Sequence, residues 1–404
     1  LLNKFIIADI YLDETKHNSN EVFDRLNIRG QTLSSIDLIR NNIFMLNSDY
    51  QKLIQKNSYN NNLQNNYDSQ LFQNEWEPFQ DHLETKFPDR EPKLLKSQVD
   101  DFFFPFALNK NHKTPKTNLV HELNMNWKGL NPDDVINEMD SYVNHYFTWL
   151  KGNDFKSRID KSYSKSLQDV IIHLHQLNTP QATIPFLMRC LYELKSNNIK
   201  EQDVIECFNI VESFLFRRTY VYDDEMTGIH AIFKKLWVET KADPKKVRLN
   251  IETKTKVFPD DKAFFEAITN KGLYIKGAQK YALLQYEEHL SNKAFEKYPN
   301  QLIETCDHLM PQSINNMNYK TQSDIDEHHR TVNLWGNLFP MSKSLNSKKS
   351  NMNTNDFYKK LKQHTRFESI ECLNKDYRNQ TWGPSLIDDR TNKIANWALN
   401  RWPF

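Results

Sequence analysis

An acidic residue and a histidine stand side by side at Asp307-His308, directly after the apolar, strand-like segment 301–305 and shortly before Pro311. Adjacent residues on a strand point to opposite faces, so both side chains can reach one small volume only if the chain bends there. Proline gives a reason for that bend, because it cannot donate to a strand ladder and its φ is fixed. The stretch predicts a turning strand that directs a carboxylate and an imidazole at one point.

Two asparagines extend this candidate site. Asn337 lies in segment 333–341, which predicts a second strand with a Gly-Asn turn, and Asn346 follows nine residues later. A neutral imidazole such as His308 suits proton abstraction from water near pH 7. Oxygen ligands from Asp307 and Asn346 suit a hard ion such as Mg²⁺ or Mn²⁺. A lone histidine is more often a surface or hydrogen-bonded core residue, so the set rather than His308 alone carries the prediction.

A basic segment follows, in which Asp356 is the one acid between residues 343 and 366. Such a run is usually a solvated face, whereas beside a phosphate-cleaving site it would include phosphate contacts. The residues expected to contact phosphate are Lys343, Lys348, Lys349 and Asn351. For His328 and His329 two positions are open: they join the site, or, as we expect, they lie on the loop that connects the two strands.

The elements that must position these residues are mostly helices. Apolar spacing between residues 47 and 290, as in segments 170–177 and 205–215, predicts amphipathic helices that pack on each other. The chain has only 8 glycines and few strand-turn-strand signals. The predicted fold is mainly α: a large helical bundle, then a small strand-turn-strand-helix unit with flanking helices, its helix starting near Asp356.

Composition excludes some functions. The 404 residues contain 53 basic and 52 acidic residues, so no global charge points to nucleic acid or a membrane. No apolar run approaches the roughly 20 residues that span a bilayer, and no signal-peptide pattern is present. The 4 scattered cysteines suggest a reducing compartment. We therefore expect a cytoplasmic protein without a membrane partner, and a chain that begins inside a domain.

The segment DHLMPQS, the Gly-Asn-Leu at 336–338 and Asn346 together resemble the HNH, or ββα-metal, nucleases. More closely, about the last hundred residues resemble the C-terminal nuclease domain of GmrSD-type modification-dependent (type IV) restriction enzymes. In that family an acid and a histidine precede x-x-Pro-Gln, and a terminal helix carries Trp and Arg. The corresponding C-terminal residues here are Trp382, Arg390, Trp397 and Trp402-Pro403.

Two further segments resemble the same enzymes. Residues 23–44 are similar to the end of their nucleotide-binding (ParB-like) domain, which implies that Asn27 and Arg29 border a nucleotide pocket. The Asp-Gly-Gln-Gln-Arg signature of that domain is missing from this chain, so an NTP is expected only for a full-length protein. Residues 212–218 resemble the helical connector, and within them Arg217 and Arg218 either contact DNA or pair with acids of the bundle.

The resemblance implies three domains: the C-terminal remnant of a nucleotide-binding domain at 1–46, an α-helical connector at 47–290 and an HNH nuclease domain at 291–404. It also implies a metal-dependent DNA endonuclease that acts on modified or phage DNA in antiviral defence. His308 would be the general base, Asp307 and Asn346 the metal ligands, and Asn337 would hold the turn and orient His308. Two alternatives are a catalytically inactive nucleic-acid-binding regulator and an RNA-cleaving toxin. A homo-oligomer is compatible with the sequence.

Overall fold

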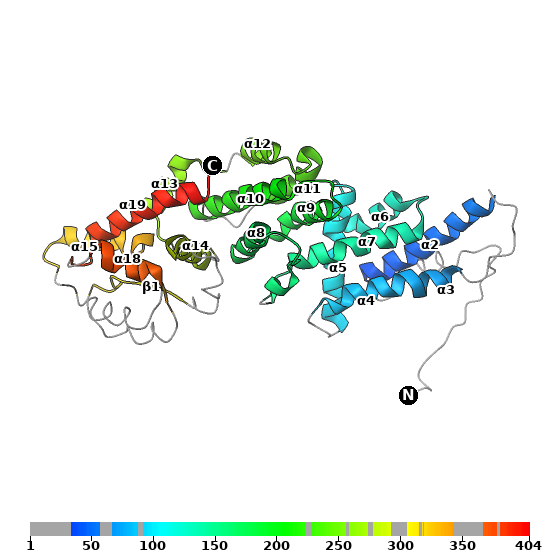
Figure 1. The fold of residues 1–404 in the computed structure, drawn as a ribbon, viewed down its shortest axis with the longest axis horizontal. Helices are drawn as coiled ribbons and strands as arrows, with labels where there is room; N and C mark the ends of the chain where they lie inside the picture. The colour runs from blue at the N-terminus through cyan, green and yellow to red at the C-terminus, as the bar shows by residue number, and fades with distance from the viewer. Residues whose placement is uncertain are drawn as a thin grey trace, which may run out of the picture. The chain divides into compact units, whose positions relative to one another are not determined.

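The computed structural model describes residues 34–404 except 57–66, 88–91, 153, 223–227, 256–257, 274–277, 292–304, 315–316, 318, 342–366 and 378–379. Within these residues the fold is mainly α with one small two-stranded sheet, as predicted (Figure 1). The predicted strand at 5–12 and the helix near Asp356 lie outside the described residues. The chain forms two compact units, 1–152 with 184–196 and 153–183 with 197–404. The domain boundaries predicted at 46 and 290 stay predictions.

The first unit is helical throughout its described part. Its elements are α2 (Ser35–Lys56), α3 (Tyr67–Leu71), η2 (Phe72–Trp76), α4 (Glu77–Thr85), α5 (Pro92–Lys110), η3 (Lys116–Asn118), α6 (Leu119–Trp127), α7 (Pro132–Thr148) and α9 (Ile184–Lys195). Helix α7 begins where the sequence favours it, because the Asn131 side chain accepts a hydrogen bond from the Asp133 N–H and Pro132 occupies the first turn. Its buried face packs on α4 and α9.

An aromatic core holds this unit together. Phe102 and Phe106 of α5 pack edge-on against Tyr146 and Tyr142 of α7, with ring centroids 5.5 Å and 5.4 Å apart. All four side chains are buried. Each such pair adds roughly 0.5–1.5 kcal/mol beyond its buried area.

The second unit contains the candidate site. Its elements are η4 (Phe155–Arg158), α8 (Lys165–Gln176), η5 (Gln181–Thr183), α10 (Glu201–Tyr222), α11 (Ile229–Thr240), α12 (Pro244–Thr255), α13 (Asp261–Asn270), α14 (Gln279–Ser291), β1 (Thr305–His308), α15 (Gln322–Thr331), η7 (Trp335–Asn337), β2 (Leu338–Met341), α18 (Glu368–Asp376) and α19 (Pro384–Arg401). Helix α10 is buried along most of its length and packs on α8, α12 and α13. It is the central helix of the unit.

Strands β1 and β2 pair antiparallel, with His308 opposite Leu338 and Thr305 opposite Met341. We call residues 305–341, which contain both strands, the finger. The second strand is shorter than the predicted segment 333–341, because residues 335–337 form a 3₁₀ turn. Every residue of β2 is buried, whereas the first three residues of β1 are half-buried.

Helix α19 runs from the finger to the central helix of the same unit (Figure 1). Its first turns pack on η7 and α15, and it also packs on α13. Aromatic rings also link this region to α10. The ring centroids of Trp335 in the finger and Tyr220 of α10 lie 6.3 Å apart, and those of Trp402 and Phe216 lie 4.0 Å apart. The turn that carries Asn337 is therefore fixed by a rigid helical frame.

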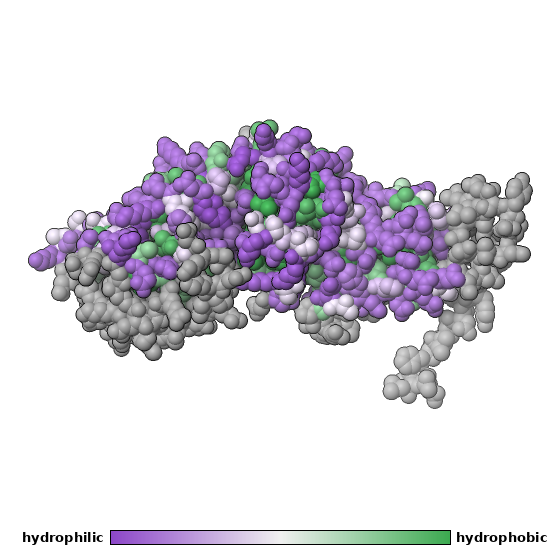
Figure 2. Space-filling model, in the orientation of Figure 1, coloured by the Kyte–Doolittle hydropathy of each residue, from purple (hydrophilic) through white to green (hydrophobic). Residues whose placement is uncertain are grey.

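No helix in the described part of the chain is long and apolar enough to cross a membrane. Figure 2 shows that hydrophilic residues cover most of the described surface on the face drawn.

Candidate functional site

The candidate site lies where β1 ends. The Asp307 side chain turns toward the next residue, so that its Oδ1 accepts a hydrogen bond from the His308 backbone N–H at 2.7 Å. This conformation brings Oδ1 to 4.0 Å from His308 Nδ1. The two side chains are largely shielded, with exposed fractions of 13% and 4%. The predicted acid–imidazole pair is thus brought to one place, at the end of the strand.

Asn337 fixes the turn behind this pair. Its side-chain oxygen accepts from the Met310 N–H at 2.7 Å, and its amide nitrogen donates to the carbonyl oxygens of Met310 at 2.9 Å and Val332 at 2.8 Å. Trp382 Nε1 donates to the same side-chain oxygen at 3.1 Å. Because Asn337 is fully buried, these bonds satisfy backbone groups that water cannot reach.

Arg390 and Gly336 attach the turn to α19. The buried Arg390 donates to the Gly336 carbonyl oxygen at 2.6 Å, and its guanidinium lies 3.8 Å from the centre of the Phe339 ring. A Cβ on Gly336 would lie 2.2 Å from the Ile387 carbonyl oxygen and 2.3 Å from Thr391 Oγ1. Only glycine allows this close approach of turn and helix.

Asn333 is a site residue that the sequence did not reveal. Its Oδ1 lies 2.9 Å from His308 Nε2 and accepts from Gln312 Nε2 at 3.1 Å. Asn333 is therefore within hydrogen-bond reach of the imidazole, whereas the side-chain hydrogen bonds of Asn337 described above go to the turn and to Trp382. Asparagine is common in this chain, and only the position of Asn333 between α15 and the Gly-Asn turn distinguishes it.

The expected position of His328 and His329 on a loop is wrong. Both lie on α15, which begins with a capping box in which Thr321 and Asp324 bond each other's backbone N–H groups. His328 is fully buried, with its Nδ1 2.6 Å from the Tyr319 hydroxyl. Burial lowers the pKa of His328, which favours the neutral ring. His328 therefore supports the fold beside the site.

The remaining predicted site residues lie outside the described part of the chain: Asn27, Arg29, Lys343, Asn346, Lys348, Lys349 and Asn351. The described residues contain no cluster of three or more His, Cys, Asp or Glu side chains suited to a metal ion. Asp307 alone is thus the described member of the predicted metal-ligand pair.

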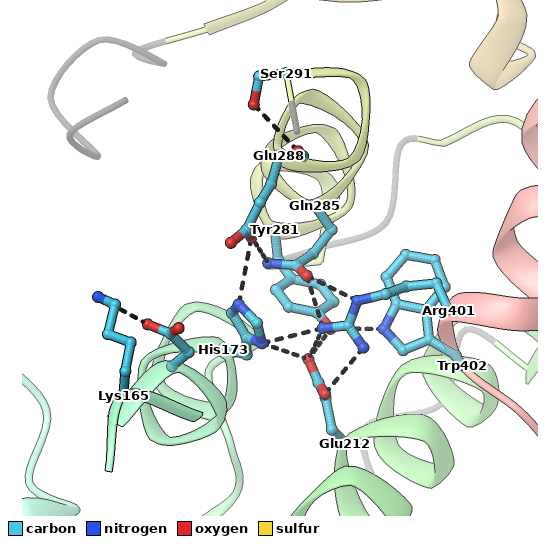
Figure 3. Close-up of polar contacts among 10 residues, drawn as sticks. Lys165, His173, Glu212, Tyr281, Gln285, Glu288, Ser291, Arg401 and Trp402 are labelled. Atoms are coloured by element: carbon cyan, nitrogen blue, oxygen red, sulfur yellow. Dashed lines mark hydrogen bonds and ion pairs between the residues drawn. The ribbon is translucent and has the colours of Figure 1, made fainter. Parts of the chain in front are cut away.

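A second polar cluster lies in the same unit, where the end of α19 meets α8, α10 and α14 (Figure 3). Arg401 donates to both carboxylate oxygens of the fully buried Glu212, at 2.6 Å and 3.2 Å, and to Gln285 Oε1 at 2.9 Å. Tyr281 donates to Glu212, and the nitrogen atoms of His173 lie 3.4 Å from Glu212 and Glu288. Burial is the largest influence on the pKa of Glu212 and would raise it, but the charges of Arg401 and His173 and the hydrogen bonds from Arg401 and Tyr281 together outweigh burial and lower the pKa. We call these residues the Glu212–Arg401 cluster.

Arg217 is also structural. It is fully buried and donates to Asp261 Oδ1 at 2.6 Å and to the carbonyl oxygens of Trp402 and Pro259 at 2.5 Å and 3.0 Å. Its guanidinium lies 4.8 Å from the centre of the Phe264 ring. Of the two alternatives for Arg217, pairing with an acid of the bundle is the one found. Arg218 is buried as well.

The fold and the site define a mainly α protein built around a two-stranded antiparallel sheet, with an aspartate and a histidine at the end of its first strand. Residues 258–397 match the family model described as GmrSD restriction endonucleases, C-terminal domain. This part of the chain is therefore a GmrSD-type C-terminal domain, and the resemblance predicted from the sequence is confirmed for it. The resemblances of segments 23–44 and 212–218 lie outside the match and stay predictions. No curated protein matches the chain.

Proposed function

We propose that this chain is the C-terminal portion of a restriction endonuclease of a defence system, and that its finger hydrolyses DNA with His308 as the general base. The observation that carries the proposal is the Asp307-His308 pair at the end of β1, inside the region that matches the GmrSD C-terminal family model. HNH chemistry is the reaction type that such a pair supports best.

His308 would accept the proton of the attacking water. The oxygen of that water then forms a bond to phosphorus, the bond from phosphorus to the leaving deoxyribose oxygen breaks, and that oxygen takes up a proton from solvent. General-base assistance of this kind contributes roughly 10²–10⁴-fold in rate. The low exposure of His308 suits the role, because a shielded imidazole keeps one orientation while it faces the reacting water.

A divalent metal fits the donor chemistry of the site. Asp307 provides a carboxylate at the strand end, and Asn346 would add an amide oxygen; both donors are hard and match Mg²⁺ or Mn²⁺ better than a soft ion. When bound, such an ion would neutralise charge on the phosphate and on the leaving oxygen. Asp307 would also keep the strand end in shape, since its Oδ1 accepts from the His308 N–H.

DNA contacts would come from the basic segment after β2. Lys343, Lys348, Lys349 and Asn351 would bind phosphates and position the duplex without reading its sequence. By analogy with the family, the substrate would be modified or phage DNA. An NTP would act only on a full-length protein, in which Asn27 and Arg29 would border the nucleotide.

A plasmid-nicking assay tests the proposal. Supercoiled plasmid and phage DNA with modified bases are incubated with the protein and Mg²⁺ or Mn²⁺, with EDTA, or with His308→Ala. We expect metal-dependent cleavage that falls by about 10²–10⁴-fold in His308→Ala. Lys246→Ala, which removes an exposed side chain on α12, is the matched control and should cut as the parent does. Equal cleavage by the parent and His308→Ala would refute the assignment of the base.

Two further arms of the same assay address the alternatives. Cleavage of RNA but not DNA under identical conditions would replace the proposal by an RNA-cleaving toxin. If the protein retards DNA in a gel but cleaves neither DNA with either metal, the proposed nuclease would be wrong, and a nucleic-acid-binding regulator would take its place.

A further inference from the structure

We infer that Asn333 is a positioning residue that fixes the orientation and tautomer of His308, and that the turn after α13 keeps Asn333 in place. This inference rests on the proposed function of His308 as a general base. It assigns a role to a residue outside the Asp-His, Gly-Asn-Leu and Asn346 pattern.

The hydrogen bonds around Asn333 define which ring nitrogen carries the proton. His308 Nε2 lies 2.9 Å from Asn333 Oδ1, and an amide oxygen can only accept, so Nε2 must be the protonated nitrogen. Gln312 Nε2 donates to the same Oδ1 at 3.1 Å, which gives this oxygen two donors. In the neutral ring the lone pair then belongs to Nδ1, the nitrogen 4.0 Å from Asp307 Oδ1. The basic nitrogen therefore faces the acid of the pair.

The backbone of Asn333 is fixed from the side of the helical bundle. Its carbonyl oxygen accepts from the Leu273 N–H at 3.1 Å. A Cβ on Gly272 would lie 2.9 Å from Asn333 Cβ and 2.9 Å from Asn333 O. This turn follows α13 directly, and α13 in turn packs on α10 and α19. Asn333 therefore lies between the imidazole of His308 and the turn at Gly272, which has no room for a side chain.

Asn333 should act on the chemical step rather than on DNA binding. Asn333→Leu and Gly272→Ala neither add nor remove a charge at the site, so both should leave the proposed phosphate contacts of the basic segment unchanged. A base displaced by about 1 Å can cost about 10²-fold in rate. We therefore expect Asn333→Leu, which is nearly isosteric but has no acceptor, to lower kcat about 10²-fold with KM nearly unchanged. Asn333→Asp, which keeps the acceptor, should retain much more of the rate.

Two measurements test the role directly. In ¹⁵N-histidine NMR of the metal-free protein, with the His308 signals assigned by their loss in His308→Ala, the parent should show a protonated Nε2 and an unprotonated Nδ1. Asn333→Leu should shift His308 toward a mixture of tautomers, whereas Asn333→Asp should not. A parent His308 protonated at Nδ1 in its neutral form, or a tautomer unchanged in Asn333→Leu, would overturn the inference.

A double-mutant cycle separates a positioning role from general damage. In the His308→Ala background Asn333→Leu should cause no further loss of kcat, because Asn333 acts through the imidazole. Gly272→Ala should lower kcat in the same direction as Asn333→Leu, again only when His308 is present. The inference would be contradicted if Asn333→Leu or Gly272→Ala lowered kcat by the same factor in the His308→Ala background as in the parent. If His308→Ala itself cuts as the parent does, the proposed function fails; if His308→Ala is impaired but Asn333→Leu is not, only the positioning role fails.

Discussion

The two ends of α19 make a useful comparison, because both bury polar side chains and use them differently. At the finger end, the shielded His308 faces the neutral amide of Asn333 and lies 4.0 Å from the carboxylate of Asp307. At the other end, the carboxylate of Glu212 and the guanidinium of Arg401 neutralise each other at 2.6 Å (Figure 3). Tyr281 also donates to Glu212, and Arg401 also donates to Gln285.

The difference indicates which cluster carries chemistry. Charges that satisfy each other inside the protein stabilise one arrangement and have no reactive partner left. An imidazole whose Nε2 donates to an amide oxygen would, in its neutral form, carry its lone pair on Nδ1, which is what the proposed general base requires. This contrast supports the proposed catalytic role of the finger, and it indicates a structural role for the Glu212–Arg401 cluster.

The largest expected effect on stability is at the Glu212–Arg401 cluster. Glu212→Ala should lower the free energy of unfolding by about 3–5 kcal/mol, because it removes the fully buried carboxylate and leaves the half-buried guanidinium of Arg401 without this partner. Guanidinium chloride denaturation of the whole chain measures this loss. The control Lys246→Ala removes an exposed ion pair with Asp243 and should cost less than about 1 kcal/mol. A similar loss in both variants would break the distinction between the two ends.

The next effect is a pH dependence near the finger, at Glu287 of α14. Its carboxylate accepts from the Ser369 N–H at the start of α18, at 3.2 Å and 3.3 Å, and burial raises its pKa to about 7. The folded state therefore retains a proton that the unfolded chain loses near its usual pKa of 4.5. Relative to Glu287→Gln, the parent should lose on the order of 3 kcal/mol as pH rises from about 4.5 to 7. Parallel stability curves for the two proteins over this window would contradict the prediction.

A smaller loss is expected where the finger meets α19. Gly336→Ala should destabilise the fold by about 1–3 kcal/mol, because the new methyl group overlaps the Ile387 carbonyl and the Thr391 side chain. Gly383→Ala is the matched control, since a Cβ there has no heavy atom within 4 Å. Thermal unfolding of both variants measures the contrast, and equal midpoints would show that the turn is not tightly packed on the helix.

Local features were predictable from the sequence. The mainly α fold follows from apolar spacing along the chain. Pro311 correctly predicts that β1 ends at His308. The capping box of α15 was also readable, because Thr321 and Asp324 stand at the required spacing. It was missed because the segment between the strands was interpreted as a loop.

Long-range contacts were not predictable. Glu212 and Arg401 are 189 residues apart, and no local pattern distinguishes this glutamate from one on a solvated face. Asn333 and Gln312 meet only because the finger folds back on itself, 21 residues apart along the chain. The roles of such residues depend on tertiary packing, which a single sequence does not contain.

The most direct test of the account measures DNA cleavage and thermal unfolding on the same preparations of the parent and His308→Ala. We predict that His308→Ala stays folded, with a loss of about 0.5–3 kcal/mol in the free energy of unfolding because a buried imidazole and its bond to Asn333 are removed. Its metal-dependent cleavage should fall by at least about 10²-fold. Undiminished cleavage by a folded His308→Ala would contradict the central claim that the finger carries the chemistry.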